Sequence, residues 1–198
     1  MMCSRLLALG LVMAPALASA DDRMIDDDTF DVSSRGGLAV DAGLFLATPS
    51  ALPSGIMTGI GVGVTRSCGC TFSYGVRASW SSITEGSMTY TVTQDDYRLR
   101  LVGAVRHDVG RGSLVLRLGV GPTFVHEVRI ANNTMGSGLT LHDGRGWGTV
   151  PAAELDGLIA LHISGAWVGI ASAGPSVDRF GGSLAWGWTA MLGVAWQP

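Results

Sequence analysis

Large apolar residues alternate with small or polar residues along most of this chain. In the segment 183–196, SLAWGWTAMLGVAW, the even positions from Leu184 to Trp196 are mostly large and apolar, and the odd positions are small or mildly polar. A period of two places the two sets on opposite faces of a β-strand. The segment also exceeds the roughly 9–11 residues that a tilted strand needs to cross a bilayer. It therefore predicts a membrane-spanning strand.

The same alternation recurs in seven earlier segments, so the chain predicts eight strands in all. The segment 166–173 has the weakest pattern, because Trp167 and Val168 compete for one face. The seven segments are 37–47, 56–66, 71–82, 97–108, 113–128, 150–163 and 166–173.

The connections between these segments alternate in length. Short turns at one end and long loops at the other are typical of outer-membrane β-barrels. We therefore predict an all-β fold, an eight-stranded antiparallel up-and-down transmembrane β-barrel. The short connections are 67–70, 109–112 and 164–165, and the mostly longer ones are 48–55, 83–96, 129–149 and 174–182.

The N-terminus has the features of a secretory signal. One arginine precedes the apolar run 6–16, and Ala18-Ser19-Ala20 matches a cleavage site of the A-x-A type. The acidic segment 21–36 has no hydrophobic period and predicts a flexible periplasmic leader. The predicted organisation is a signal peptide at 1–20, a leader at 21–36 and the barrel at 37–198.

Composition agrees with strands that cross a membrane. The chain is 47% hydrophobic and 15% charged, with a mean hydropathy of +0.34, yet the part after the signal has no apolar run of helix-spanning length. A net charge of −3 gives no reason to expect nucleic-acid binding.

Two readings of the alternation place the apolar face differently. In a membrane barrel it faces lipid, whereas in a secreted lipocalin-like barrel it faces an apolar ligand inside. The polar face consists mostly of Gly, Ala and Ser, which suits a narrow lumen. Aromatic residues gather at the strand ends, as in membrane-interface belts, and this favours the membrane. The loop-end belt is Trp80, Tyr97, Phe124 and Trp186; the turn-end belt is Phe72, Trp167 and Trp196.

The inner face would then carry charges of both signs. Charges shielded from bulk water must pair, and eight strands enclose a lumen that side chains can fill. We expect a structural polar plug, with a narrow channel for ions or small solutes as the alternative. The predicted lumen network is Asp41, Arg77, Arg98, Arg100, Arg106, Arg117, Glu127, Glu154 and Asp156.

With these features the chain resembles the small eight-stranded outer-membrane proteins, the OmpA-type transmembrane domain and OmpX-like barrels. The resemblance covers 37–196 and rests on strand number, loop asymmetry, aromatic belts and a charged lumen. It implies a monomer in the outer membrane of a diderm bacterium with a periplasmic N-terminus. Leu192, Val194 and Trp196 look like the terminal signal that the barrel-assembly machinery reads in such proteins.

Two pairs of residues could carry chemistry. Cys68 and Cys70 flank one glycine in a predicted turn and form a candidate disulfide, which would be strained. His162 and Ser164 resemble the His-x-Ser pair of lipid A deacylases, but they lie at the predicted periplasmic end. The alternative for His162 is a lumen histidine beside Asp156. We identify no metal site, cofactor or catalytic residue.

The function expected from the sequence is therefore non-enzymatic. It is a structural or surface-interaction role, with outer-membrane lipid and lipopolysaccharide as surroundings. Contact with a partner is expected in the longest loop, 129–149, because binding residues concentrate in loops on a rigid scaffold. A channel, a lipid A-modifying enzyme and a secreted barrel for an apolar ligand are the alternatives.

Overall fold

The computed structural model describes residues 37–198 apart from 51, 53–54, 69–70, 133–141 and 181. The predicted signal peptide and leader, 1–20 and 21–36, lie outside the described residues. The described part forms eight strands: β1 (Leu38–Ala47), β2 (Met57–Ser67), β3 (Phe72–Gly86), β4 (Tyr90–Val109), β5 (Gly112–Ala131), β6 (Gly144–Ser164), β7 (Trp167–Phe180) and β8 (Ser183–Trp196).

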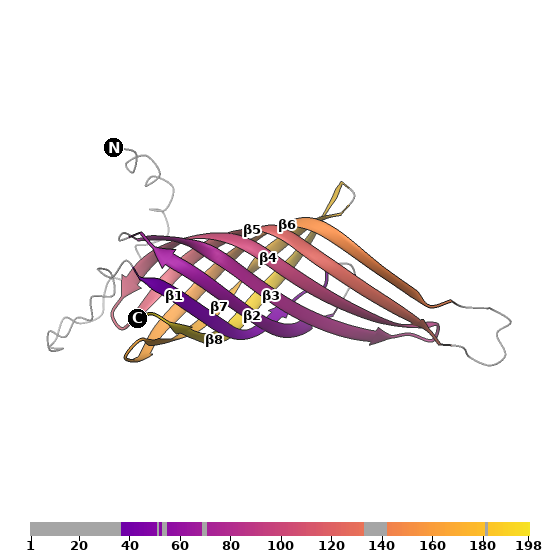
Figure 1. The fold of residues 1–198 in the computed structure, drawn as a ribbon, viewed down its shortest axis with the longest axis horizontal. Helices are drawn as coiled ribbons and strands as arrows, with labels where there is room; N and C mark the ends of the chain where they lie inside the picture. Colours follow the sequence, from indigo (N-terminus) through magenta and orange to yellow (C-terminus); the bar gives the residue numbers. More distant parts are fainter. Residues whose placement is uncertain (1–36, 51, 53–54, 69–70, 133–141, 181) are drawn as a thin grey trace, which may run out of the picture. The chain divides into compact units, whose positions relative to one another are not determined.

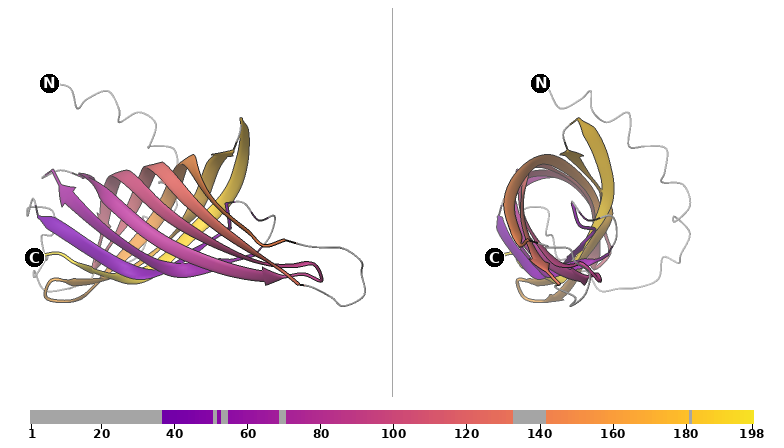
Figure 2. Two further views of the ribbon diagram at one scale, coloured as in Figure 1. Left: turned by 45° about the vertical axis from the view of Figure 1, so that its right-hand side comes forward. Right: turned by 90° about the vertical axis from the view of Figure 1, so that its right-hand side faces the viewer.

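The strands form one closed antiparallel barrel. Each strand pairs with the next along the chain, and β1 pairs with β8 to close the ring, which the end-on view of Figure 2 shows. This arrangement confirms the predicted fold class. Gly110 and Gly165 adopt positive φ angles of 57° and 56° in the tight turns after β4 and β6, where glycine carries no steric penalty. No helix within the described residues is long and apolar enough to cross a membrane.

Five strands, β3 to β7, extend well beyond the limits that alternation predicts. At the right-hand end of Figure 1 the ribbons of β3, β4, β5 and β6 run past those of β1 and β2. Pairs such as Ile83 with Gln94 and His126 with Trp147 continue the ladders. The predicted long loop 83–96 is therefore mostly paired strand, and residues 129–131 and 144–149 of the predicted loop 129–149 also lie in strands, whereas 133–141 lie outside the described residues. β7 also continues to Phe180. A sheet with water on both faces needs no apolar alternation. This explains why the hydrophobic pattern does not predict how far these strands extend.

The two faces of the barrel differ sharply in polarity. Outward leucines are exposed, as at Leu101 (65%) and Leu116 (57%), whereas neighbouring inward arginines are buried, as at Arg100 (2%) and Arg117 (5%). A soluble barrel has the opposite arrangement. The apolar face therefore points outward, as the membrane interpretation requires.

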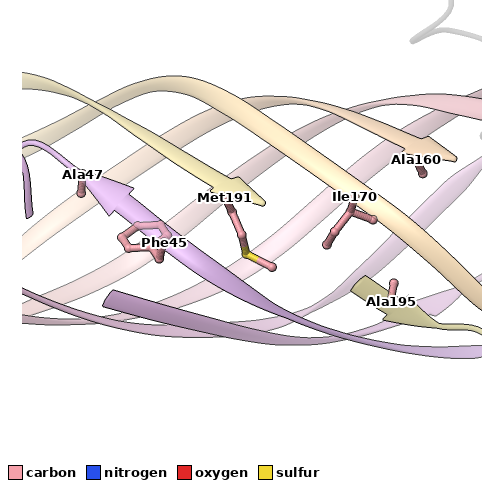
Figure 3. Close-up of a cluster of buried hydrophobic side chains, with 6 residues drawn as sticks. All are labelled: Phe45, Ala47, Ala160, Ile170, Met191 and Ala195. Atoms are coloured by element: carbon pink, nitrogen blue, oxygen red, sulfur yellow. The ribbon is translucent and has the colours of Figure 1, made fainter. Parts of the chain in front are cut away.

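Some apolar side chains also lie inside the barrel. Figure 3 shows three of them, Phe45, Ile170 and Met191, pointing inward from β1, β7 and β8. Smaller alanines complete the cluster, so apolar groups fill space between the buried charges. The members are Phe45, Ala47, Ala160, Ile170, Met191 and Ala195.

The seam that closes the barrel depends on two glycines. Gly43 of β1 and Gly193 of β8 lie directly opposite each other. A Cβ atom on Gly43 would lie 2.7 Å from the Gly193 Cα, and one on Gly193 would lie 2.6 Å from the Gly43 Cα. Both distances are shorter than real Cβ contacts, so the first and last strands pair in this way only with glycine at both positions.

Candidate functional site

The lumen contains an ion network centred on Asp156 of β6. Its carboxylate accepts hydrogen bonds from Arg77 of β3 (3.0 Å) and Arg117 of β5 (2.9 Å), and also from the Thr189 hydroxyl of β8 (3.2 Å). All of these side chains are buried. One carboxylate therefore links four strands across the inside of the ring.

A second network lies nearer the long-loop end of the barrel. Arg100 pairs with Glu154 at 3.0 Å and donates to the Thr123 hydroxyl at 2.8 Å. Arg98 pairs with Asp96 at 3.2 Å, and Asp96 also accepts from the Gln94 amide at 2.8 Å. Buried charges are tolerated when they are paired and hydrogen-bonded in this way.

Phe45 lies between the two networks. The guanidinium carbons of Arg77 and Arg98 lie 5.3 and 5.4 Å from its ring centroid, within cation–π range. Arg77 also donates to the Met191 sulfur at 3.0 Å. A buried aromatic ring therefore lies between two arginines inside the barrel.

The segment after β1 folds into the mouth of the barrel. The Ser50 hydroxyl lies 2.8 Å from an Asp96 oxygen and 2.9 Å from an Asp178 oxygen, and Ser50 is itself buried. The Thr48 amide donates to the Trp188 carbonyl at 3.0 Å. Ser50 therefore attaches the first connection to the wall of the barrel at β4 and β7. We call these contacts the Ser50 latch.

Beyond the mouth, the extended strands form what we call the protruding sheet, residues 83–86, 90–95, 125–131 and 144–149. The pairing of β6 with β7 begins at Ala152, so among the described residues no strand covers the outer edge of 144–149. An uncovered edge presents unpaired backbone groups to other chains.

A hollow of about 420 Å³ lies beside this edge. Gly144, Gly146 and Gly148 line it, and a Cβ atom added to any of them would meet nothing within 4 Å. Arg129 also lines the hollow and is hydrogen-bonded to Glu127, which raises the pKa of Arg129 above its ordinary value. The complete lining is Val125, Glu127, Arg129, Gly144, Arg145, Gly146, Gly148 and Phe180.

The structure brings seven of the nine predicted network residues into the lumen as buried side chains. Arg106 and Glu127 lie outside these networks, because each sits near a strand end and pairs with a residue of its own strand, Asp108 and Arg129 respectively. The buried seven are Asp41, Arg77, Arg98, Arg100, Arg117, Glu154 and Asp156.

Sequence reasoning missed Ser50, Gln94, Asp96 and Asp178, which are all buried. They fall in segments that were predicted to be loops. Extending the two-residue period of the following strand back from Arg98 would have placed Asp96 and Gln94 on the inner face. For Ser50 the sequence carries no such signal, because its burial depends on a loop folding inward.

The predicted belt residues lie on the outer face with substantial exposure, from 38% for Trp80 to 75% for Trp186. Two further tryptophans share this outer face, Trp188 (38%) and Trp147 (68%). Tyr97 and Phe124 are paired on adjacent strands. The seven predicted residues are Phe72, Trp80, Tyr97, Phe124, Trp167, Trp186 and Trp196.

The residues singled out for chemistry lie at the short-turn end. His162 and Ser164 are exposed on either side of a register shift in β6. His162 is also six residues from Asp156, about 20 Å along the strand, so it does not form the expected pair with that carboxylate. Cys68 is exposed, whereas Cys70 lies outside the described residues, so their disulfide stays a prediction. The described residues contain no group of three or more metal-ligating side chains.

No protein-family model and no curated protein sequence matches the chain. Among solved structures it is similar to Neisserial surface protein A, with a TM-score of 0.56, 10% identity and coverage of 82% of this chain and 97% of that one. It is also similar to Ail of Yersinia pestis, with a TM-score of 0.54, 13% identity and coverage of 83% and 100%.

A second structure of Ail, in complex with the heparin analogue sucrose octasulfate, is similar with a TM-score of 0.50, 12% identity and coverage of 82% and 97%. At these identities the likeness concerns the fold. The chain has the fold of small eight-stranded outer-membrane barrels, which confirms the predicted resemblance.

Proposed function

We propose that this protein is a monomeric, non-enzymatic outer-membrane barrel that contacts partners outside the cell through the protruding sheet. The N-terminus and the short turns would then face the periplasm, and the protruding sheet would extend beyond the outer leaflet. Lipopolysaccharide would surround the barrel, and the barrel-assembly machinery would insert it. The uncovered β6 edge beside a glycine-lined hollow is the observation that carries this proposal.

Strand length supports an external role for the sheet. β4, β5 and β6 contain 20, 20 and 21 residues, whereas crossing a bilayer takes roughly 9–11 residues. About half of each strand is therefore not needed to span the membrane. Paired strands that continue into solvent offer a rigid surface with backbone groups available to a partner.

The interior of the barrel gives little support for a transport function. Phe45, Arg77 and Arg98 occupy its interior, and the Ser50 latch holds the first connection in its mouth. Opening a channel would require several buried ion pairs to separate together, which is costly. We therefore place the function on the surface of the protein.

The test uses cells that display the full chain and measures how well they adhere to immobilised extracellular-matrix protein. We expect adherence above that of cells lacking the protein, and a several-fold loss with Gly146→Lys, because a charged side chain would fill the hollow and discourage edge pairing. Gly146→Ala adds only one methyl group in open space and is the matched control.

A second control places the same charge elsewhere. Met88→Lys, at a 90% exposed position of the β3–β4 tip, adds a lysine away from the hollow and should retain adherence. If displayed protein gives no adherence, or if both lysine variants lose it equally, the surface proposal is wrong. Stepwise conductance of the wild-type protein in planar bilayers would favour the channel instead.

A further inference from the structure

Three aromatic rings stack on the outer face of the protruding sheet. The ring centroid of Trp147 lies 4.4 Å from that of His126 and 5.9 Å from that of Tyr97, with interplanar angles of 24° and 27°. They come from β6, β5 and β4 respectively. Despite both contacts, Trp147 is still 68% exposed. We call these three residues the Trp147 platform.

The platform begins where the aromatic belt ends. On β5, His126 is the next outward residue after Phe124 of the belt, about 7 Å farther along the strand. On β4, Tyr97 is itself a belt residue. Between the two aromatic belts the outward face is apolar and exposed. The platform lies at the long-loop side of this apolar band, and it therefore faces the headgroup layer rather than the hydrocarbon.

Polar groups accompany the rings. The Asp95 carboxylate lies 3.6 Å from the His126 Nδ1. Arg145 is exposed on the uncovered edge of β6, two residues before Trp147. Carboxylate and imidazole groups can hydrogen-bond to hydroxyls, and a guanidinium pairs strongly with phosphate.

We propose that the Trp147 platform binds the phosphorylated sugar headgroup of an outer-leaflet glycolipid. The electron-rich face of an aromatic ring attracts the weakly positive C–H groups of a sugar ring, while Asp95 and His126 would meet its hydroxyls and Arg145 its phosphate. A phospholipid headgroup has no flat ring to stack on Trp147. The proposal rests on the outer-membrane location argued above.

The experiment reconstitutes the full chain in vesicles of phosphatidylethanolamine and phosphatidylglycerol, with and without lipid A. After mild detergent extraction, the ratio of lipid A to phosphatidylglycerol retained by the protein is measured by mass spectrometry. We expect several-fold enrichment of lipid A for the wild type and a ratio near that of the bulk vesicle for Trp147→Ala. Trp188→Ala removes an exposed tryptophan outside the platform and should keep the enrichment.

The outcomes separate this proposal from the location on which it rests. If the wild type inserts as a heat-modifiable band but retains both lipids in the bulk ratio, the platform proposal is overturned and the rings are ordinary belt residues. Equal loss of enrichment in both tryptophan variants also overturns it. If the wild type fails to insert, the membrane location itself is wrong, and the platform proposal is overturned with it.

Discussion

Asp156 is the carboxylate that the first lumen network shares. Its carboxylate accepts hydrogen bonds from two guanidinium groups and a hydroxyl, and it is only 3% exposed. Removing one member of a buried ion network costs more than the network contributes, because the remaining charges stay buried and unpaired. At this scale the contribution of a residue therefore depends on the partners it would leave behind.

We expect Asp156→Ala to lower the stability of the barrel by about 3–5 kcal/mol, because Arg77 and Arg117 would lose their shared carboxylate. The measurement is urea unfolding of protein reconstituted in lipid, followed by the gel shift between folded and unfolded bands. Asp108→Ala is the control, because its pair with Arg106 lies near the turn and is partly exposed. Equal urea midpoints for Asp156→Ala and Asp108→Ala would show that the Asp156 network does not stabilise the barrel.

The Ser50 latch gives a second prediction at this scale. One hydroxyl proton serves a single carboxylate at a time, but Ser50 also donates its backbone N–H to Asp96 at 3.3 Å. Ser50→Ala removes a hydrogen bond to a charged group, which contributes about 1.5–3 kcal/mol. We expect exchange of the Thr48 and Ser50 amide hydrogens to accelerate by roughly ten-fold or more.

The matched control for the latch is Ser113→Ala, which removes another buried serine hydroxyl near the short turns. It should leave exchange of the Thr48 and Ser50 amides unchanged. Asp178→Asn keeps an amide that can hydrogen-bond to the Ser50 hydroxyl and should also keep exchange slow. Unchanged exchange in Ser50→Ala would mean that Ser50 does not hold the segment in place.

At the scale of elements, the strands divide into a part that spans the lipid and a part that does not. The alternation predicts the first part well: β8 has the bounds 183–196 expected from the sequence. It fails for the second part, because residues 83–96 mix apolar side chains such as Ile83 and Val92 with polar ones and have no sustained apolar alternation, yet they pair as a hairpin from Ile83 to Gln94. Backbone pairing, not side-chain polarity, decides how far these strands continue.

Closure of the ring gives a prediction for the β1–β8 pair. Gly193→Ala would place a methyl group against the backbone of Gly43 and Ala42, which prevents the strands from approaching. We expect a much smaller fraction of heat-modifiable, folded protein after refolding into detergent. Gly148→Ala adds the same methyl group in open space and should refold like the wild type. Equal yields would show that the seam tolerates a side chain.

At the scale of the described barrel, most buried polar and charged groups lie inside and large apolar residues cover the outer face. The sequence predicts this inversion from tryptophans at the strand ends and from a polar face poor in charge. It does not predict which charges meet, because the Asp156 network joins four strands whose lateral order and stagger come from closure of the ring. It predicts a polar plug but not that an aromatic ring lies within it, since Phe45 resembles any other strand residue until its position between Arg77 and Arg98 is known.

The inverted polarity is tested by adding a charge to the outer face. Leu101 is 65% exposed in the middle of β4. If this face meets lipid, Leu101→Arg should lower stability in bilayers by about 2–4 kcal/mol, whereas on a water-facing surface the same change would stay within about 0.5 kcal/mol. Met88→Arg, at a 90% exposed position near the tip of the protruding sheet, is the control. Urea unfolding in lipid vesicles should show a larger loss of stability for Leu101→Arg than for Met88→Arg, because only Leu101 lies between the two aromatic belts. Equal stabilities of the two variants would mean that the apolar outer face contacts water rather than lipid.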